Sequence, residues 1–422
     1  MTVNEPAVAI GIDIGTSGVR TVALSQEGHV VGFTSMPFAD ATETRSPTSW
    51  WEGVRSCLTR LASECSLSSV RGIAVDGTSG TVLATDSAGA PVGDVLMYNE
   101  PCPDASIVAR IAQEAPLESP ARGANSGLAR AVHLSRRVGA SHVMHQADWV
   151  LLQLGLSQPA TDENNALKTG YDLNASTWPA WIEAAGLTID KLPSVYRAGE
   201  PIQMVGGFAA AIGLPSSCRL HAGTTDGCAS FLATGASETG DGVTALGSTM
   251  VIKLASDRPI NAPEYGVYSH RVLDFWLVGG ASNSGGAVIR ALFGDDRLAQ
   301  LTEKLDADHP TGLQYYPLLK PGERFPINDP SYRPRLEPRP KDDAVFFQGV
   351  LEGMTKIERL GYGRLNDLGA AQLRTVRTVG GGAKNLVWNE LRQRALGVDF
   401  LPSRSSEAAV GTASLVLAES RR

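Results

Sequence analysis

Short apolar runs alternate along the chain with segments whose apolar positions recur every three or four residues. The short runs end at Gly, Thr or Ser, a pattern typical of strands that lead into turns. They lie at residues 7–14, 70–75, 219–225, 242–254 and 375–379. The segments with helical spacing lie at residues 49–62, 146–154, 226–233, 344–360 and 385–396. This alternation predicts an α/β architecture.

Two parts of the chain depart from simple alternation. Residues 9–24 and 242–254 share one pattern, an apolar strand, a glycine with two hydroxyl residues, and a second apolar strand. This duplication places one turn of phosphate size in each half of the chain. Residues 317–340 hold seven of the 24 prolines. Because neither a helix nor a central strand tolerates that density, we expect an extended loop there.

Length and composition favour a soluble protein of two domains. The chain has 422 residues, more than one hydrophobic core usually supports. Hydrophobic residues make up 43% and charged residues 19%, as in ordinary globular proteins. No uncharged apolar run approaches the roughly 18 residues of a membrane span. The first residues lack a basic segment followed by an apolar stretch, so we expect no membrane association and no secretory signal.

Charge and cysteine content exclude further classes. The net charge is −7 and no basic cluster stands out, which argues against nucleic-acid binding. The five cysteines are odd in number and contain no C-x-x-C, so we expect a reduced, cytoplasmic protein. His142 and His145 lie in a segment that we interpret as a helix, and without a third ligand nearby we expect no metal site at these histidines.

Three glycine-rich turns follow predicted strands. They are Gly15–Gly18, Gly247–Thr249 and Gly380–Asn385. Such turns bind anions because unpaired backbone N–H groups converge on one point. Taken alone, each turn is more typical of an ordinary connection between strands than of an anion site. A P-loop and a G-x-G-x-x-G fingerprint are absent, and the first of the eight lysines is Lys168. We therefore expect any phosphates to be held by backbone donors, hydroxyls and a metal.

Three aspartates stand next to these turns or to similar ones. Asp13 lies near the end of an apolar strand, where burying a carboxylate without a partner costs free energy. Its side chain therefore either caps the turn or binds Mg²⁺. Asp226 opens a predicted helix, where it is either an N-cap or a general base for a substrate hydroxyl. Asp76 precedes Gly77-Thr78-Ser79 and has an Asx-turn as its structural alternative.

In combination, these segments resemble the FGGY-type carbohydrate kinases of the actin/hexokinase/Hsp70 superfold. The matching segments are GIDIGTSGVRTVALSQEGHVV, AGTTDGCASFLATGA, TALGSTMVIK, GGASNSGG, PLLKPGERFP and TVGGGAKNLVWNELRQRALGV. The resemblance implies two actin/hexokinase-like (ribonuclease H-like) α/β domains flanking an active-site cleft. We expect an N-terminal sugar-binding domain at residues 1–225, an ATP-binding domain at residues 226–403, and a C-terminal segment, 404–422, that packs back on the first.

The same resemblance implies roles for individual residues. Asp226 would be the catalytic base and would contact the sugar, and Asp13 would hold Mg²⁺ beside the substrate. Ser79 and Asp76 would contact the sugar. The residues expected to bind ATP are Thr16, Ser17, Gly247, Ser248, Thr249, Gly381, Gly382, Asn385 and Trp388. We expect no partner beyond the sugar and ATP, and a monomer or weak dimer.

The loop Asp76–Thr81 favours one branch of the family. It is similar to the Asp-x-Thr-x-Ser loop of ribulose-phosphorylating members and, with LMYNE and ADWVLLQL, resembles the compact, xylulokinase-like D-ribulose kinases of cyanobacteria and plants. Glu100 replaces the Asp or Gln of many relatives, which leaves its contact with the sugar open. The alternatives are a D-xylulose or other polyol kinase, a non-catalytic actin-like or sugar-sensing ATP-binding protein, and a bare ATPase or chaperone.

Overall fold

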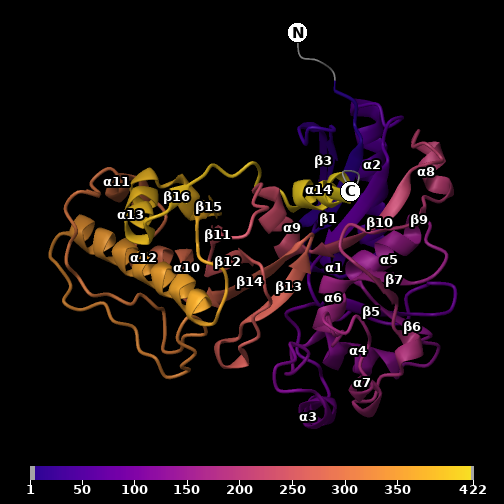
Figure 1. The fold of residues 1–422 in the computed structure, drawn as a ribbon, viewed down its shortest axis with the longest axis horizontal. Coiled ribbons are helices and arrows are strands. Elements are labelled where there is room, and N and C mark those ends of the chain that lie inside the picture. Colours follow the sequence, from indigo (N-terminus) through magenta and orange to yellow (C-terminus); the bar gives the residue numbers. More distant parts are fainter. Residues whose placement is uncertain (1–4, 420–422) are drawn as a thin grey trace. The chain divides into compact units, whose positions relative to one another are not determined.

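The computed structural model describes residues 5–419, which fold into two compact units (Figure 1). Unit 1 consists of the chain up to Ala233, the short segment Arg271–Asp274 and the chain from Glu407 onward. Unit 2 consists of Thr234–His270 and Phe275–Ser406. Both units combine a six-stranded mixed sheet with helices, as an α/β fold requires.

The sheet of unit 1 has the strand order β3-β2-β1-β4-β10-β9. Strands β1, β4 and β10 are parallel, so their carboxyl ends lie at the same edge, while the other three pair antiparallel to their neighbours. The strands are β1 Ala9–Ile14, β2 Gly18–Leu24, β3 Val30–Pro37, β4 Gly72–Gly77, β9 Pro201–Met204 and β10 Arg219–Thr225.

The two faces of this sheet are covered by helices from opposite ends of the chain. Alternate residues of β1, among them Ile10 and Ile12, pack in one core with Trp50 of α2 (Pro47–Glu64). The other face, represented by Ala9, packs against α14 (Ala408–Glu419). A Cβ on Gly11 would lie only 2.0 Å from the Ala409 carbonyl oxygen, so β1 needs glycine for this approach.

Helix α9 (Asp226–Ala233) also belongs to unit 1, so the unit boundary follows Ala233 rather than residue 225. The reason is its packing on α14, since a Cβ on Gly411 would lie 1.9 Å from the Ala229 carbonyl oxygen. The segment Arg271–Asp274 belongs to unit 1 because the Arg271 side chain pairs with Glu163. In addition, the Arg271 N–H donates to the side-chain oxygen of Asn164, and the Asn164 side-chain nitrogen donates to the Arg271 carbonyl.

Additional elements of unit 1 flank its sheet. The helices are α1 Ala41–Thr44, α3 Ala105–Glu114, α4 Gly127–Ser135, α5 Gln146–Gln153, α6 Glu163–Lys168, α7 Trp181–Ala184 and α8 Gly207–Ala211. The strand pairs are β5 Val82–Thr85 with β6 His142–His145, and β7 Ala160–Asp162 with β8 Ser194–Tyr196. His142 and His145 thus lie on a strand, and the helix expected there is wrong. His145 is buried and contacts Asp148 and Thr169, each at 2.9 Å.

The sheet of unit 2 has the order β13-β14-β12-β11-β15-β16. Its strands are β11 Asp241–Leu246, β12 Met250–Ser256, β13 Tyr268–Val272, β14 Phe275–Ser282, β15 Thr375–Val379 and β16 Asp399–Phe400. The helices are α10 Gly286–Phe293, α11 Leu298–Thr302, α12 Asp343–Asp367 and α13 Leu386–Leu396. Residues 317–340 contain neither helix nor strand, as their prolines predicted.

Helix α12 extends seven residues beyond the predicted end at residue 360, because Tyr362 and Leu365 continue its buried face. Gly361 permits this, since a Cβ there would lie 2.5 Å from the Ile252 side chain of β12.

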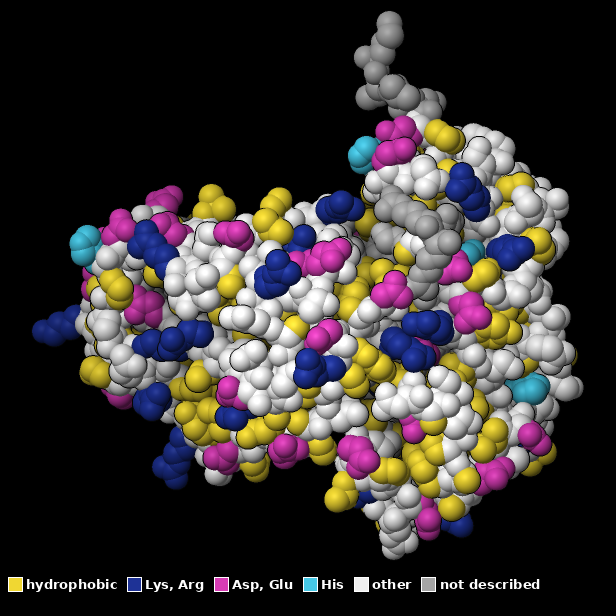
Figure 2. Space-filling model, viewed as in Figure 1, with side chains coloured by type: hydrophobic (Ala, Val, Ile, Leu, Met, Phe, Trp, Pro, Cys, Tyr) yellow, Lys and Arg dark blue, Asp and Glu magenta, His cyan; other side chains and the backbone are white. Residues whose placement is uncertain are grey.

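The surface carries mixed charge. On the face drawn in Figure 2, Lys and Arg side chains are interspersed with Asp and Glu side chains. This face therefore shows no continuous basic surface of the kind that binds a nucleic-acid backbone. Among residues 5–419, none of the helices combines the length and apolarity needed to cross a membrane.

Candidate active site

Three aspartates gather at the carboxyl edge of the unit 1 sheet. Asp13 on β1 stands opposite Asp76 on β4 in the parallel register, and Thr224 on β10 stands opposite Asp76 on the other side. Asp226 follows β10 directly as the first residue of α9. Burial raises the pKa of Asp13 and of Asp76, and the nearby charge of Asp226 raises both further. Sequence reasoning named these aspartates, and the parallel topology brings them together.

Asp13 and Asp76 have different environments. The Asp13 carboxylate is paired with Arg20 at 3.0 Å, although burial still raises its pKa. Asp76 is fully buried, and the Thr412 hydroxyl of α14 donates to its Oδ2. Burial and the Asp13 charge raise the pKa of Asp76 well above its ordinary range. Of the two carboxyls, Asp76 therefore has the environment that more strongly favours the protonated form, and Asp13 has the partner that favours the charged form.

Asp76 lies on the sheet face that packs against α14. Its side chain has 0% exposure, its Oδ2 accepts from Thr412, and its Oδ1 has no partner among the described residues, so its expected contact with a sugar stays a prediction. This placement follows from the alternation of β4, because Asp76 lies on the same face of the sheet as Ala74, which packs with α14. Asp76 supports Asp13 from within the core.

The first glycine turn joins β1 and β2 and exposes Thr16 and Ser17. The Gly15 N–H donates to the Gly18 carbonyl at 3.0 Å, which closes the turn. Arg20 Nη2 donates to Ser17 Oγ at 2.8 Å while its Nη1 binds Asp13. One arginine therefore ties the exposed turn to the buried carboxylate.

The loop after β4 lies beside the aspartates. The Thr78 hydroxyl contacts the Thr81 hydroxyl at 2.6 Å, and the Thr78 N–H donates to Gln146 Oε1 at 3.0 Å. Ser79 Oγ is buried and has no partner within residues 5–419. The Glu100 carboxylate is already occupied, since Arg45 binds both of its oxygens at 2.6 and 2.7 Å. Within the described residues, the Ser79 hydroxyl is therefore a free polar group here, and so is the Gln146 amide nitrogen, whereas the Glu100 carboxylate is bonded.

Unit 2 contains a separate pocket of about 600 Å³. Its wall includes six of the residues predicted to bind ATP, namely Gly247, Ser248, Gly381, Gly382, Asn385 and Trp388. Thr249 belongs to the same turn but does not line the pocket, and Thr16 and Ser17 belong to unit 1. Apolar side chains that the sequence analysis did not name complete the wall, among them Ile289, Phe347 and Leu351.

Backbone geometry brings two glycine turns together in this pocket. Gly380 ends β15 with φ of +87°, and a Cβ there would lie 2.6 Å from the Leu246 carbonyl oxygen, immediately before Gly247. A Cβ on Gly382 would lie 2.8 Å from the Trp388 ring. Both positions therefore require glycine, Gly380 for its close approach to Leu246 and Gly382 for its close approach to the indole.

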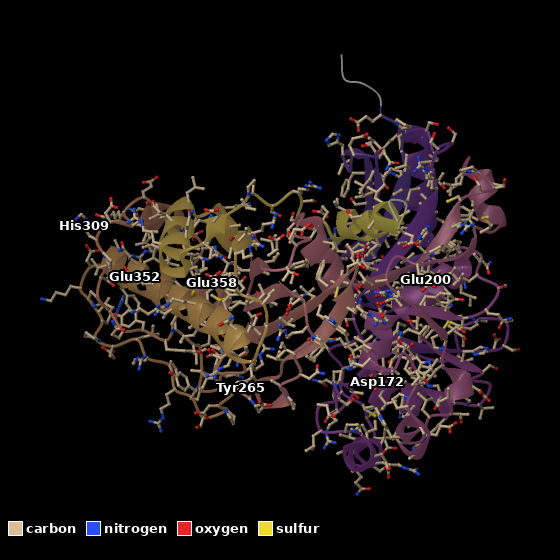
Figure 3. All side chains as sticks on the ribbon, viewed as in Figure 1. Asp172, Glu200, Tyr265, His309, Glu352 and Glu358 are labelled. Atoms are coloured by element: carbon tan, nitrogen blue, oxygen red, sulfur yellow. The ribbon has the colours of Figure 1, made fainter. Side chains whose placement is uncertain are left out.

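A buried ion pair joins the two helices, α12 and α13, that contribute residues to the pocket wall. Glu352 and Glu358 both project from α12 (Figure 3). Glu358 pairs with Arg392 of α13 at 2.6 Å, and neither side chain has any exposed surface. Trp388 Nε1 donates to Thr355 Oγ1 of α12 at 3.1 Å. These bonds fix α13 on α12 and hence the position of Trp388.

The pocket also contains cations that the sequence analysis did not expect. Arg290 of α10 lines it and donates from Nη2 to Ser248 Oγ at 3.0 Å, and Lys384 lines it as well. The α10 N-terminus is joined to the same turn, since the Gly286 N–H donates to the Gly247 carbonyl at 2.8 Å. A basic residue within an apolar helix gave no sequence signal, so Arg290 joins the backbone and hydroxyl groups as a further candidate for holding phosphates, and the expectation drawn from the sequence stays a prediction.

The carboxylates fit one mode of magnesium binding. Among residues 5–419, His, Cys, Asp and Glu side chains form no group of three that could hold a metal unaided. Mg²⁺ commonly uses only one or two carboxylates, together with water and substrate phosphates. Asp13, as a carboxyl paired with Arg20 beside an exposed Gly/Thr/Ser turn, meets that requirement.

Comparison with known proteins decides the family. A model of the FGGY family of carbohydrate kinases, N-terminal domain, matches residues 8–119, and the model of the C-terminal domain of that family matches residues 239–419. The chain belongs to the FGGY family of carbohydrate kinases. It is therefore an ATP-dependent phosphotransferase that acts on a carbohydrate.

This FGGY kinase has relatives of low identity along nearly its whole length. It is 23% identical to the xylulose kinase of Escherichia coli K12, with 96% of this chain and 89% of the relative covered. The solved xylulose kinase of Rhodospirillum rubrum has a TM-score of 0.83 at 23% identity, covering 98% of this chain and 90% of the other. The gluconate kinase of Lactobacillus acidophilus has a TM-score of 0.82 at 17% identity, covering 98% and 89%. Kinases of different sugars thus share this fold.

Proposed function

We propose that this kinase transfers the γ-phosphoryl group of Mg-ATP to the terminal hydroxyl of a ketopentose, with D-ribulose as substrate and D-ribulose 5-phosphate as product. The observation that carries the kinase chemistry is the convergence of Asp13 and Asp226 at parallel strand ends in unit 1. The nucleotide proposal rests on the glycine-lined pocket of unit 2.

The choice of D-ribulose rests on the loop after β4. Its sequence, Asp76-Gly77-Thr78-Ser79-Gly80, resembles that of ribulose-phosphorylating members and leaves Ser79 Oγ unpartnered. D-xylulose is the second candidate, because the relatives of 23% identity are named xylulose kinases. Enzymes of different sugars share the fold, so the fold favours neither sugar.

The mechanism assigns one task to each group. Asp226 orients the attacking hydroxyl and accepts its proton as general base. Asp13, held by Arg20, would bind Mg²⁺ directly or through water. When bound, the ion neutralises charge on the β- and γ-phosphates. Arg290 and the backbone at Gly247 and Ser248 hold the phosphates of the nucleotide, while the Trp388 surface packs against its base.

A substrate panel tests this proposal. Purified protein with Mg-ATP is assayed for ADP release with D-ribulose, D-xylulose, L-ribulose and glycerol. We expect the highest kcat/KM with D-ribulose. A higher kcat/KM with D-xylulose would support the second candidate, and ADP release that no sugar accelerates would refute the sugar-kinase assignment itself.

The cellular setting is part of the proposal. Within residues 5–419 all five cysteines are free, and four are buried. Free thiols are typical of a reducing compartment, so we infer that the enzyme works in the cytoplasm.

A further inference from the structure

Arg130 is a buried cation that the mechanism does not use. It is the fourth residue of α4, is 1% exposed, and donates to three carbonyl oxygens. Its Nε donates to Gly80 at 3.0 Å, and its Nη1 donates to Tyr98 at 3.2 Å and to Glu100 at 2.8 Å. Arg130 thereby joins the loop after β4 to the segment 97–100. A cation in the first turns of a helix opposes the helix dipole, so helix stability does not explain the arginine.

The donors of Arg130 are not all used. A guanidinium has five N–H groups, and the three bonds above occupy those of Nε and Nη1. The two hydrogens of Nη2 have no acceptor among residues 5–419, and no carboxylate there forms an ion pair with Arg130. Burial lowers the pKa of Arg130 to about 10, so the group is still charged at neutral pH. Charged donors that no protein group accepts are satisfied by a polar ligand or by water, so Nη2 is available to a ligand.

The unused donors lie beside the proposed sugar loop. Arg130 Nη2 is 2.9 Å from the position that a Cβ on residue 80 would occupy, and Gly80 has φ of +88°. Glycine therefore both forms this turn and leaves Nη2 uncovered. The adjacent Ser79 Oγ is also without a partner within the described residues. Two unpartnered polar groups thus adjoin the same turn.

We propose that Arg130 is a specificity residue whose Nη2 donates to a hydroxyl or carbonyl oxygen of the bound sugar. Its bonds to the three carbonyls hold the two loops at the spacing that this oxygen needs. The ligand class is a neutral, open-chain ketose or polyol. The inference rests on the proposed function, since it assumes that a sugar binds at the loop after β4.

Steady-state kinetics of three variants and one control test this role. Arg130→Lys keeps the charge but loses the forked geometry, and Arg130→Met removes the charge. Gly80→Ala keeps the guanidinium and places a methyl group against Nη2. Arg136→Met is the matched control, because Arg136 is the exposed C-cap of the same helix and its ion pair with half-buried Asp104 is a long one, at 3.4 Å.

We expect Arg130→Lys and Gly80→Ala to raise the KM for the sugar by about 10-fold to 100-fold, the loss typical of one charged hydrogen bond. The KM for ATP should change less than twofold, and Arg136→Met should match the wild type in both constants. A purely structural role predicts a lower melting temperature with equal effects on both KM values. That result, or a sugar KM within twofold of the wild type in both variants, would overturn the inference.

The outcomes separate this inference from the proposed function. If the wild type responds to a sugar and the variants respond with unchanged sugar KM, only the role of Arg130 fails. If no sugar accelerates the wild type, both fail. Should Arg130→Met not fold, Arg130→Lys and Gly80→Ala still decide the question.

Discussion

The three aspartates of the candidate active site have different surroundings. Asp76 is buried beneath α14, where burial and the Asp13 charge raise its pKa, whereas Asp13 is paired with Arg20. Asp226 opens a helix, and the Gly227 N–H donates to its Oδ1 at 2.7 Å. Asp226 is the aspartate to which we assign the role of general base. Its loss should therefore reduce the rate of the chemical step more than the loss of either other aspartate.

Asp226→Asn tests that assignment. The amide cannot accept the hydroxyl proton, so kcat with the sugar should fall by about 10²-fold to 10⁴-fold. ATP affinity should be unchanged, because the nucleotide pocket belongs to unit 2. Sugar-dependent turnover and ATP binding by calorimetry measure the two effects. Undiminished turnover would remove Asp226 from the role of base.

Arg290→Met tests the cation of the nucleotide pocket. Loss of a charged donor beside Ser248 should raise the dissociation constant of ADP by about 10-fold to 100-fold. Adenosine, which lacks phosphates, should bind as before. Isothermal titration with both ligands gives the comparison, and exposed Arg258 of unit 2 supplies the control variant Arg258→Met. Equal losses for ADP and adenosine would assign Arg290 to packing instead.

At the residue scale, the sequence was informative where a candidate residue lies in or next to a glycine-rich turn that follows a strand. Asp13, Asp226, Ser248 and Asn385 stand next to glycine turns, and local pattern alone located them. The partner of Asp76, Thr412, lies 336 residues away in the chain, and no local pattern indicates that contact. Arg130 and Arg290 were missed for the same reason, because a basic residue within an apolar helix is indistinguishable from a solvent-facing one until the fold is known.

Among the elements, α14 contributes most to the architecture of unit 1. It packs against β1 and α9 at separations that only glycine allows, and it supplies Thr412. The sequence analysis expected the C-terminal segment to return to the first domain by resemblance alone. The physical basis of that return is the set of small residues on both sides of the contact, including Gly11, Ala229, Ala409 and Gly411.

Gly411→Val tests the close packing of α14. The first carbon of the new side chain would overlap the Ala229 carbonyl, so the free energy of unfolding should fall by about 1–3 kcal/mol or more. Urea unfolding measures the change. Ser414→Ala, at a partly exposed position of the same helix, should be close to neutral. Equal stability of Gly411→Val and the wild type would contradict the packing described here.

Helix α6 offers a test of pH dependence. Asp162 caps it by accepting from the Asn164 and Asn165 N–H groups at 2.9 and 3.0 Å. Burial, followed by the charge of Asp148, raises the pKa of Asp162 from 3.8 to about 6. The folded state therefore holds this proton at pH values where the unfolded chain has released it. The stability that Asp162 contributes is greatest at low pH and is lost as pH rises from about 4 to about 6.

Asp162→Asn removes this titration and retains a capping residue. The unfolding free energy of the wild type minus that of Asp162→Asn should decrease between pH 4 and pH 6 and stay constant above that range. Denaturant unfolding at several pH values measures the difference. An increase over the same range would show that the carboxyl is ionised in the folded state.

Most elements were predictable because their patterns are strong and local. The strands before the glycine turns and the helices α2, α5 and α13 lie close to their predicted ranges. Strand β6 was missed because His142–His145 is short and precedes α5 without a turn signal. The end of α12 was placed too early because Gly361 and Gly363 resemble a helix stop, whereas Gly361 permits contact with β12.

At the scale of the whole molecule, length predicted two domains and the duplicated glycine turn predicted one phosphate site in each. The structure gives each unit a six-stranded sheet, and the family models match both parts of the chain. The boundaries were less predictable, because Arg271–Asp274 and the chain from Glu407 join unit 1 through contacts distant in sequence. Kinases of different sugars share this fold, so the fold does not determine the sugar preference.

Product analysis tests the central claim most directly. The protein is incubated with Mg-ATP and D-ribulose, and the products are identified by mass spectrometry and phosphorus NMR. We predict ADP and a ketopentose monophosphate in equal amounts, with phosphate on the terminal carbon, and neither product in appreciable amount from Asp226→Asn. Formation of ADP with free phosphate and no sugar phosphate, whichever sugar is supplied, would contradict the account.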